Sequence, residues 1–323
     1  MPHPTRRALL GTVLATPPIL AHAQGEWPNR TVTWVVPFTP GGITDTNARL
    51  VAQGLSQRLG QTVIIENRPG AGGSIGTDAV ARAAADGYTM VYGTLGTLCA
   101  NPVLYPAITT NATRDFAAVH GLTDTPNLLV ANPDRPFRDV AGLVAHARAN
   151  PERVTFASSG IGTGTHLAAA LFEYVADIRM TQVPYRGSAP ALTDLVAGRT
   201  DIMFDYLISA GPHVRERRLR ALAMTTAERM AVVPDIPAIA ETLPGAEARS
   251  WSGIFMPART PAPILARLAQ EMAAVLRDPS VVQTLASGGS TPLMLATDTF
   301  QGFVATEMPR WRAVIERSGA RAG

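Results

Sequence analysis

Two glycine-rich turns carry the residue types best suited to binding an anion. The first turn, residues 40–45 (PGGITD), follows the apolar segment 31–36, and the second, residues 158–165 (SSGIGTGT), follows the segment 154–157. Each turn is expected to open a helix, whose first backbone N–H groups have no partner within the helix. The positive end of the helix dipole lies at the same place. Each turn can therefore attract an oxyanion without a charged side chain, and two such turns far apart in the chain suggest two lobes that close on a small acid.

In the first turn, the glycines permit a close approach of the backbone to a ligand. Gly41 and Gly42 are candidate contacts, with an ordinary strand-to-helix turn as the alternative. Phe38, just before the turn, is a further candidate. Asp45 is expected more often as a helix cap than as a contact, because its carboxylate would repel a ligand carboxylate. If it touches the ligand, it would meet an amide, a hydroxyl, an ammonium group or a bridging water.

The second turn is the better anion site, because its side chains add hydroxyl donors to the backbone N–H groups. Its candidate residues are Ser158, Ser159, Gly160, Thr163 and Thr165. Together they could give one carboxylate several hydrogen bonds. His166 opens the following helix, and a capping or packing role is expected more often there than a ligand contact.

A third strand–turn–helix corner follows the segment 181–184. It contains Tyr185, Arg186, Gly187 and Ser188. Arg186 could pair with a second carboxylate, although an arginine in a loop is usually a solvated surface charge. Asp205, after the segment 201–204, would lie at the carboxyl edge of a sheet, where ligands bind in open α/β folds. The alternative for Asp205 is a turn residue that ends its strand.

A fourth glycine run, residues 70–76 (GAGGSIG), resembles part of a dinucleotide fingerprint. That fingerprint also needs an acidic residue about 20 positions later, at the end of the next strand. The next expected strand, 89–92, ends in Gly93-Thr94-Leu95-Gly96, without an acid. We therefore reject a dinucleotide site, and no cofactor is expected.

Enzyme chemistry finds little support in the sequence. It contains no G-x-S-x-G nucleophile elbow, and the four histidines after residue 23 are scattered without zinc-ligand spacing. Neither a metal site nor a catalytic residue is expected. A hydrolase that uses Ser159 with His166 remains the weak enzymatic alternative.

Strands and helices alternate along the chain, and they must position these turns. Expected strands span 32–36, 62–66, 89–92, 127–131, 153–157, 181–184, 201–204 and 221–225. Expected helices span 44–59, 75–84, 140–149, 165–175, 190–197 and 264–276, with a final helix that Pro309 should kink. The alternation predicts an α/β fold with two mostly parallel sheets flanked by helices and a ligand cleft between the lobes. Turn-rich passages at 122–126 and 243–253 divide the chain into lobe 1, residues 24–124 and 249–323, and lobe 2, residues 125–248.

The first residues predict export. Arg6-Arg7, an apolar run to Leu20 and the sequence Ala21-His22-Ala23 form a signal peptide, residues 1–23, cleaved near Ala23. Both the twin-arginine and the general secretory route fit. Removal of this segment takes two of the 28 basic residues and none of the 25 acidic ones, which leaves a net charge of +1. This near-neutral charge gives no case for nucleic acid binding. The one cysteine, Cys99, allows no intrachain disulfide.

Several segments resemble one known family, the substrate-binding proteins of tripartite tricarboxylate transporters, also called Bug receptors. They are 37–49 (PFTPGGITDTNAR), 64–90 (IIENRPGAGGSIGTDAVARAAADGYTM), 158–172 (SSGIGTGTHLAAALF), 183–205 (VPYRGSAPALTDLVAGRTDIMFD) and 236–245 (IPAIAETLPG). The resemblance covers essentially the whole chain after the signal peptide. It implies a type II periplasmic binding fold with two crossing segments between lobes. It also favours the first turn as part of the site, and the Gly187-Ser188 backbone over the Arg186 side chain.

The function that this resemblance implies is a periplasmic receptor for a small organic carboxylate. Its expected partners are that ligand and, transiently, membrane transporter subunits, and the receptor is expected to be a monomer. A ligand-binding sensor subunit is the alternative. The chain departs from the family pattern at Ala170, where a glutamate is usual, at Ala118 in the segment 115–119, and in the segment 237–243. These departures concern packing and partner contacts more than ligand binding, and the sequence leaves the identity of the acid open.

Overall fold

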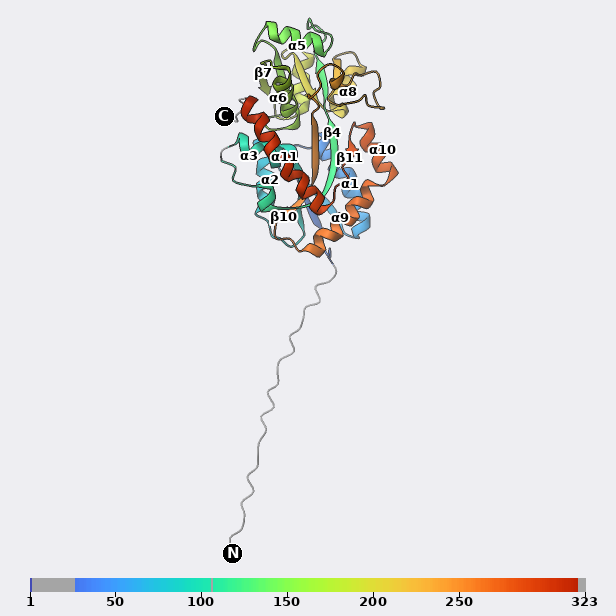
Figure 1. The fold of residues 1–323 in the computed structure, drawn as a ribbon. Helices are drawn as coiled ribbons and strands as arrows, with labels where there is room; N and C mark the ends of the chain where they lie inside the picture. Colours follow the sequence, from blue (N-terminus) through green and yellow to red (C-terminus); the bar gives the residue numbers. More distant parts are fainter. Residues whose placement is uncertain (2–26, 106, 319–323) are drawn as a thin grey trace.

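The computed structural model describes residues 27–105 and 107–318, together with Met1. This part of the chain forms two lobes, each built on one sheet with helices packed around it (Figure 1). The expected cleavage site near Ala23 lies outside the described residues. No described helix is long and apolar enough to cross a membrane.

The first lobe contains a six-stranded sheet in the order β11-β4-β10-β3-β1-β2. Its strands are β1 (Val32–Val36), β2 (Val63–Asn67), β3 (Thr89–Thr94), β4 (Phe116–Pro126), β10 (Arg249–Pro257) and β11 (Thr291–Pro292). Strands β2 and β3 flank β1, and both run parallel to it. The apolar run of β1 suits this central place, because Val32, Trp34 and Val36 are fully buried.

The second lobe contains a five-stranded sheet in the order β7-β6-β8-β5-β9. Its strands are β5 (Leu128–Ala131), β6 (Thr155–Ser158), β7 (Thr181–Pro184), β8 (Ile202–Asp205) and β9 (Arg220–Met224). Strand β6 is parallel to β7 and β8, whereas β5 is antiparallel to both β8 and β9. Every strand of this sheet begins within two residues of its expected position.

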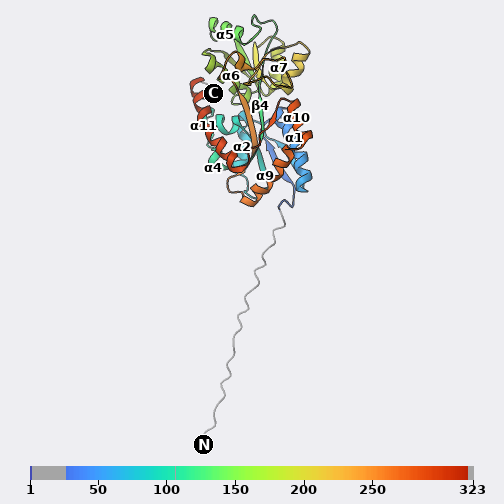
Figure 2. The same ribbon diagram turned by 45° about the vertical axis from the view of Figure 1, so that its right-hand side comes forward.

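Both sheets are mixed, which corrects the expectation of mostly parallel sheets. In the second sheet the antiparallel strand is β5, and in the first sheet the reason lies in the two segments that join the lobes. Strands β4 and β10 pair antiparallel over their whole length, from Arg249 opposite Pro126 to Pro257 opposite Phe116. Because the chain leaves the first sheet along β4 and returns to it along β10, these two strands must run in opposite directions. The views in Figures 1 and 2 show them at the centre of the molecule, next to the second lobe.

Helices connect the strands and surround the sheets. They are α1 (Ile43–Leu59), α2 (Ser74–Ala81), α3 (Asn101–Leu104), α4 (Ala112–Asp115), α5 (Val140–Ala149), α6 (Gly164–Ala176), α7 (Ser188–Val196), α8 (Leu207–Arg215), α9 (Ala262–Leu276), α10 (Pro279–Ser287) and α11 (Thr297–Ser318). Short turns η1 (Ala71–Gly73), η2 (Gly96–Ala100) and η3 (Ile239–Glu241) complete the order. Gly198, two residues after α7, has the left-handed φ of +73° expected of a residue that follows a helix.

The last helix, α11, packs against elements of both lobes. It lies along β4 and η2 of the first lobe and along α6 of the second (Figure 1). One continuous hydrophobic core therefore contains Phe255 of β10, Phe172 of α6 and Trp311 of α11. Two further cores stabilise the individual lobes, one beneath α1 and α9 and the other beneath α7 and α8.

Candidate ligand-binding site between the lobes

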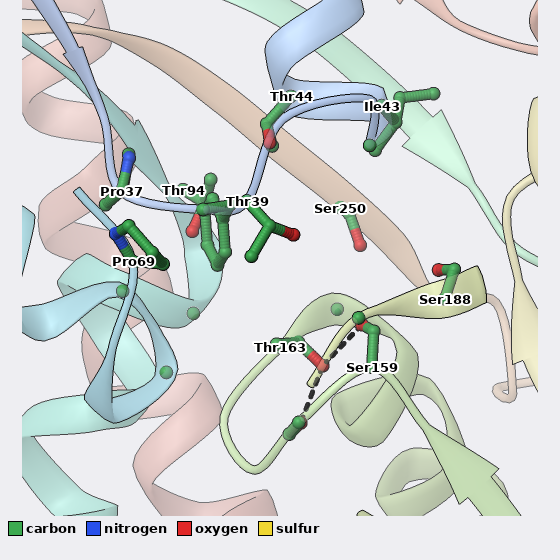
Figure 3. A pocket seen from close by; sticks show the side chains of 18 of the residues that line it. Pro37, Thr39, Ile43, Thr44, Pro69, Thr94, Ser159, Thr163, Ser188 and Ser250 are labelled. Carbon is green, nitrogen blue, oxygen red and sulfur yellow. Dashed lines mark hydrogen bonds between the residues drawn. The ribbon is translucent and has the colours of Figure 1, made fainter. Parts of the chain in front are cut away.

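A cavity of about 630 Å³ lies between the two lobes. Its wall in the first lobe comes from residues 37–39, 42–44, 69–73, 92 and 94–96. The second lobe contributes residues 159, 160, 163, 164, 185–188 and 206, and the two crossing strands contribute residues 123, 125 and 250–252. In Figure 3, Thr39 and Ile43 lie on one side, Ser159 and Ser188 lie on the other, and Ser250 lies between them. A ligand in this cavity would contact both lobes at once.

Five helices begin at the cavity wall. Among the described hydrogen bonds, none joins the side chain of an N-cap residue to a backbone N–H group at the start of any of these helices. The N-cap residues are Gly42 of α1, Gly73 of α2, Thr163 of α6, Gly187 of α7 and Tyr206 of α8. All five of these residues line the cavity. At the start of α2 the preceding turn already binds two N–H groups, because the Ser74 N–H donates to the Ala71 carbonyl and the Ile75 N–H donates to the Gly70 carbonyl. The N–H groups at the starts of the other four helices, and the positive dipole ends of all five, therefore meet around one enclosed space.

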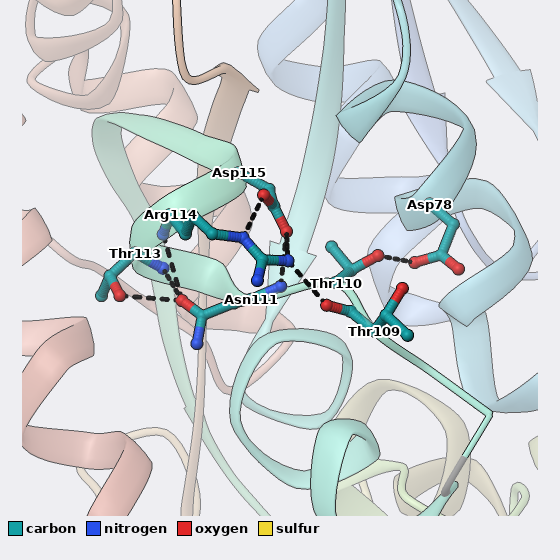
Figure 4. Close-up of polar contacts among 7 residues, drawn as sticks. All are labelled: Asp78, Thr109, Thr110, Asn111, Thr113, Arg114 and Asp115. Carbon is teal, nitrogen blue, oxygen red and sulfur yellow. Dashed lines mark hydrogen bonds and ion pairs between the residues drawn. The ribbon is translucent and has the colours of Figure 1, made fainter.

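Helices that begin away from the cavity include three with ordinary side-chain caps. Asn111 accepts hydrogen bonds from the N–H groups of Thr113 and Arg114 at the start of α4 (Figure 4). Asp139 caps α5, and Asp278 caps α10. The chain thus places capping side chains on these remote helices and leaves the helix starts around the cavity open for another acceptor.

The turn before α6 is held in shape by its own hydroxyl groups. The Ser159 N–H donates to Thr165 Oγ1 over 2.8 Å, and Thr163 Oγ1 donates to the Gly160 carbonyl over 2.7 Å. Gly160 has a φ of +134°, a backbone conformation that side chains with a Cβ rarely adopt. The glycine therefore allows the chain to turn sharply at the cavity wall, with Ser159 and Thr163 beside it (Figure 3).

The cavity wall carries one charged side chain among the described residues, that of Arg186. No aspartate or glutamate lines it. The crossing strands add uncharged hydroxyl groups: Thr123 Oγ1 and Ser252 Oγ lie 2.8 Å apart, and Ser252 donates to the Tyr92 hydroxyl over 3.0 Å. Helix N-termini, an arginine and hydroxyl groups together suit an anionic ligand.

The lobes contact each other around the cavity. The Tyr105 hydroxyl donates to the Ile161 carbonyl across the lobe boundary over 3.3 Å. A Cβ atom on Gly162 would lie 2.0 Å from Asn101 Oδ1, and one on Gly96 would lie 2.2 Å from the Gly162 carbonyl oxygen. Glycine is therefore required here for the close approach of the lobes.

Eight of the residues predicted from sequence line this cavity. They are Phe38, Gly42, Ser159, Gly160, Thr163, Tyr185, Gly187 and Ser188. The three predicted corners therefore meet at one place. Arg186, which ranked below the Gly187-Ser188 backbone, also lines the cavity.

Gly41 and Asp45 were also predicted as contacts, but they do not line the cavity. The Asp45 carboxylate accepts the Gly41 N–H over 2.9 Å and pairs with Arg49, and it also accepts from the Asn67 amide over 3.0 Å. Burial opposes ionisation, but these partners outweigh it and lower the pKa of the Asp45 carboxyl. Asp45 therefore stabilises the turn, in line with the structural role expected of it.

Ser158 and His166 also lie outside the wall. Ser158 is fully buried and its hydroxyl accepts from the Gln182 amide over 2.8 Å. His166 stacks on Phe156, and its Nδ1 accepts the Gly162 N–H over 3.1 Å. Burial lowers the pKa of His166 to about 4, so its ring is neutral at physiological pH.

The Ser159–His166 pair of the hydrolase alternative is not formed. The Ser159 hydroxyl bonds with Thr163 and Thr165, and no described hydrogen bond joins it to His166. The part of the chain that the structure describes also contains no group of three or more metal-ligating side chains.

Asp205 lies directly behind the wall. It is fully buried at the end of β8, and its Oδ1 accepts a hydrogen bond from the Ser188 hydroxyl over 2.8 Å. Its Oδ2 is buried without a hydrogen-bond partner among the described residues. Burial raises the pKa of the Asp205 carboxyl to about 7, although the Ser188 hydroxyl and the Tyr206 N–H oppose this shift.

Sequence reasoning missed several parts of the wall, among them residues 92 and 94–96 and residues 123 and 125. The glycine run 69–73 was set aside with the dinucleotide hypothesis, yet it lines the cavity. The sequence signal for this loop was the run of glycines itself. Gly70, Gly72 and Gly73 all have a positive φ in the structure and form a tight loop before α2. No local sequence pattern marked residues 250–252 or Tyr206 as site residues. Residues 250–252 reach the wall because β10 crosses between the lobes, and Tyr206 reaches it because β8 pairs within the second sheet.

Comparison with known proteins places the chain in a family. Residues 47–320 match the model of the tripartite tricarboxylate transporter family receptor. The chain is 35% identical over 317 residues to protein BugT of Bordetella pertussis, which covers 97% of both chains. It is also similar to the solved structure of Rpa4515 of R. palustris with adipate, with a TM-score of 0.86, 37% identity and coverage of 92% of this chain and 99% of that one. MatC of Rhodopseudomonas palustris, solved with bound malate, gives a TM-score of 0.82, 36% identity and coverage of 90% and 100%.

Proposed function

This chain belongs to the tripartite tricarboxylate transporter receptor family, and from that membership we propose that it captures a small organic carboxylate in the cavity between its lobes. The loaded receptor would then deliver the carboxylate to membrane subunits of a tripartite transporter through a transient contact. Receptors of this family are periplasmic. Residues 1–23 would direct export by the twin-arginine or the general secretory route, with cleavage near Ala23.

The observation that carries this proposal is the set of five helix N-termini without a side-chain cap around one cavity. A helix N-terminus contributes about 0.3–1 kcal/mol to a nearby anion, and about 2 kcal/mol where the anion is partly buried. Micromolar affinity requires about −8 kcal/mol. Several N-termini that act together, with hydroxyl donors from both lobes, supply an attraction of the required size without an ion pair.

Two solved relatives support the ligand class. Their structures contain adipate and malate, both dicarboxylates of different length. The wall of this cavity has one arginine and no acidic side chain, so it offers a carboxylate no repulsion from an ionised neighbour at the wall. We place the contacts at the eight predicted residues that line the cavity, with Asp45 and His166 as supports of the turns.

Closure of the lobes would couple ligand capture to recognition by the transporter. We propose lobe limits of residues 24–124 with 249–323, and of residues 125–248; the end of β4 at Pro126 and the start of β10 at Arg249 support them. Because the ligand would touch both lobes only when they are closed, it would shift the population toward the closed form.

Calorimetric titration of the exported protein, purified from a periplasmic fraction, tests this proposal. The panel contains adipate, malate, citrate and benzoate, with a neutral sugar and a primary amine as controls. Saturable binding of at least one carboxylate, without binding of the controls, is expected. Binding of the sugar or the amine alone would contradict the proposal, as would chemical conversion of a bound carboxylate, which would revive the enzymatic alternative.

A further inference from the structure

Asp205 lies behind the cavity wall and accepts a hydrogen bond from a hydroxyl group of that wall. Ser188 begins α7 and lines the cavity, and its hydroxyl donates to Asp205 Oδ1 over 2.8 Å. Asp205 itself is fully buried and reaches no ligand directly. A hydroxyl group has one proton. The hydrogen-bond partner that takes this proton therefore decides whether Ser188 can act as a donor or only as an acceptor toward a ligand.

The carboxyl group of Asp205 has hydrogen-bond partners but no described cation beside it. Its Oδ2 has no hydrogen-bond partner among the described residues, and no described arginine pairs with it. A buried carboxylate in such a place is costly, whereas the protonated form is not. The raised pKa of about 7 agrees with this geometry.

The elements around Asp205 bring few titratable groups to it. Strands β5 and β6 carry none, and the adjacent Tyr206 has its own pKa raised by burial. On α7, Asp194 binds Tyr185 and Arg199 instead.

The remaining neighbours are equally separate. Helix α8 has His213 and Arg215 in its last turn, at the end remote from Asp205. Helix α6 carries the neutral His166 and also Glu173, which accepts the Met180 N–H. Arg186 lies in the wall of the cavity.

We infer that Asp205 is a positioning residue that couples carboxylate binding to the uptake of one proton, through the hydroxyl of Ser188. When Asp205 is ionised, the Ser188 proton is committed to Oδ1, and Ser188 presents only lone pairs to the cavity. When Asp205 takes a proton from solvent, its O–H donates to Ser188 Oγ, and the Ser188 proton is free to turn to the ligand. A ligand carboxylate therefore favours the protonated form.

Linkage then requires affinity to fall as pH rises. This inference rests on the proposed function, but its test is separate, because binding at pH 6 tests the function and only the pH dependence tests the coupling. Adipate serves as the probe, with malate in its place if adipate does not saturate the protein. The carboxyl groups of both compounds are ionised above about pH 6.

Calorimetric titrations from pH 6 to 8.5 measure the effect. The wild-type dissociation constant is expected to rise by about tenfold per pH unit at most once pH exceeds the pKa of Asp205, with about one proton taken up per ligand. The Asp205→Asn variant cannot ionise, and its dissociation constant is expected to stay within about twofold over the range. Ser188→Ala should bind more weakly at pH 6 and lose the slope. Asp134→Asn, an exposed carboxyl of the same lobe, should keep the wild-type slope.

Two results would overturn the inference. One is a wild-type dissociation constant that does not change with pH, and the other is an Asp205→Asn variant with the wild-type slope. A carbon-13 NMR titration of aspartate carboxyl groups in the ligand-free protein, assigned by comparison with Asp205→Asn, provides a test that needs no ligand. A signal of Asp205 that is already ionised at pH 5 would contradict the coupling, and a midpoint near neutral pH supports it.

Discussion

At the scale of single residues, two neighbouring glycines serve different purposes. Gly160 has a φ of +134° and lines the cavity, and a Cβ atom added to it would lie in ordinary van der Waals contact, 3.5 Å from Thr163 and from the Tyr185 carbonyl oxygen. Gly162 has a φ of +80°, but it lies against Asn101 of the other lobe. A side chain on Gly160 would therefore enter the binding space, whereas one on Gly162 would separate the lobes.

Comparison of a Gly160 variant with a control variant distinguishes an effect on ligand affinity from an effect on the free energy of unfolding. Gly160→Ala forces a side chain into an unfavourable conformation, at a cost of about 1–2 kcal/mol in the free energy of unfolding, and it narrows the cavity. Gly198→Ala is the matched control, because Gly198 also has a positive φ but lies away from the cavity. Both variants should unfold at lower denaturant concentration, and only Gly160→Ala should lose at least about tenfold in carboxylate affinity. Equal affinity losses would remove Gly160 from the binding site.

Asp205 also makes stability depend on pH. Its pKa of about 7 in the folded protein exceeds the value of about 3.9 in an unfolded chain. The folded protein thus holds the proton more tightly, and the stability from this group is fully present below pH 4 and is lost as pH rises to 7. His166 acts in the opposite sense, because its pKa of about 4 lies below the unfolded value.

Denaturant unfolding at several pH values isolates this contribution. The free energy of unfolding of Asp205→Asn, relative to wild type, should rise with pH between 4 and 7 by at most about 1.4 kcal/mol per unit, and then level off. Asp134→Asn, at an exposed position, should show no such slope. A difference that falls with pH, or that does not vary, would show that Asp205 is not a buried acid of raised pKa.

At the scale of elements, α11 packs against the crossing strands and against elements of both lobes. The Glu307 carboxylate accepts the indole N–H of Trp251 in β10 over 3.1 Å and that of Trp311 over 3.0 Å. All three residues are buried. Loss of this acceptor would leave two buried donors without partners, and each costs about 1–3 kcal/mol.

Two substitutions at Glu307 distinguish the hydrogen bonds from the packing. Glu307→Gln keeps one acceptor oxygen and should lower the free energy of unfolding by about 1–2 kcal/mol. Glu307→Leu keeps the bulk but neither acceptor, and should lower it by about 2–5 kcal/mol. Thermal unfolding monitored by tryptophan fluorescence measures both. If Glu307→Leu is as stable as Glu307→Gln, the carboxylate does not hold the two indoles.

At the scale of the whole molecule, sequence patterns predicted two lobes, and only the family resemblance implied the two segments that cross between them. Short apolar strands such as β1 and β5 carry their own signal, since each is bounded by turn residues. The sequence did not predict β4 and β10 as strands, because their pairing joins residues far apart in the chain, such as Arg249 and Pro126, which are 123 residues apart. For the same reason the first sheet is mixed, and the hydroxyl groups of residues 250–252 could not be assigned to the site.

The candidate site was predictable where a motif is local. The turns before α6 and α7 contain their glycines and hydroxyl groups within a few residues, and both line the cavity. Whether an individual side chain lines the cavity or is packed inside a lobe depends on its burial, which no local sequence pattern reveals. Asp45 and His166 point into packed surroundings, whereas the loop 69–73 reaches the wall only because the second lobe packs against it.

The most direct test of the account is a crystal structure of the exported protein with the carboxylate that binds it most tightly in the calorimetric panel. The account predicts one carboxylate group of the ligand within hydrogen-bond distance of backbone N–H groups at the start of α6 or α7, with the remainder of the ligand enclosed by residues 39–44 of the other lobe. A ligand outside the cavity would contradict it, as would a ligand held by Arg186 alone without any contact to a helix N-terminus.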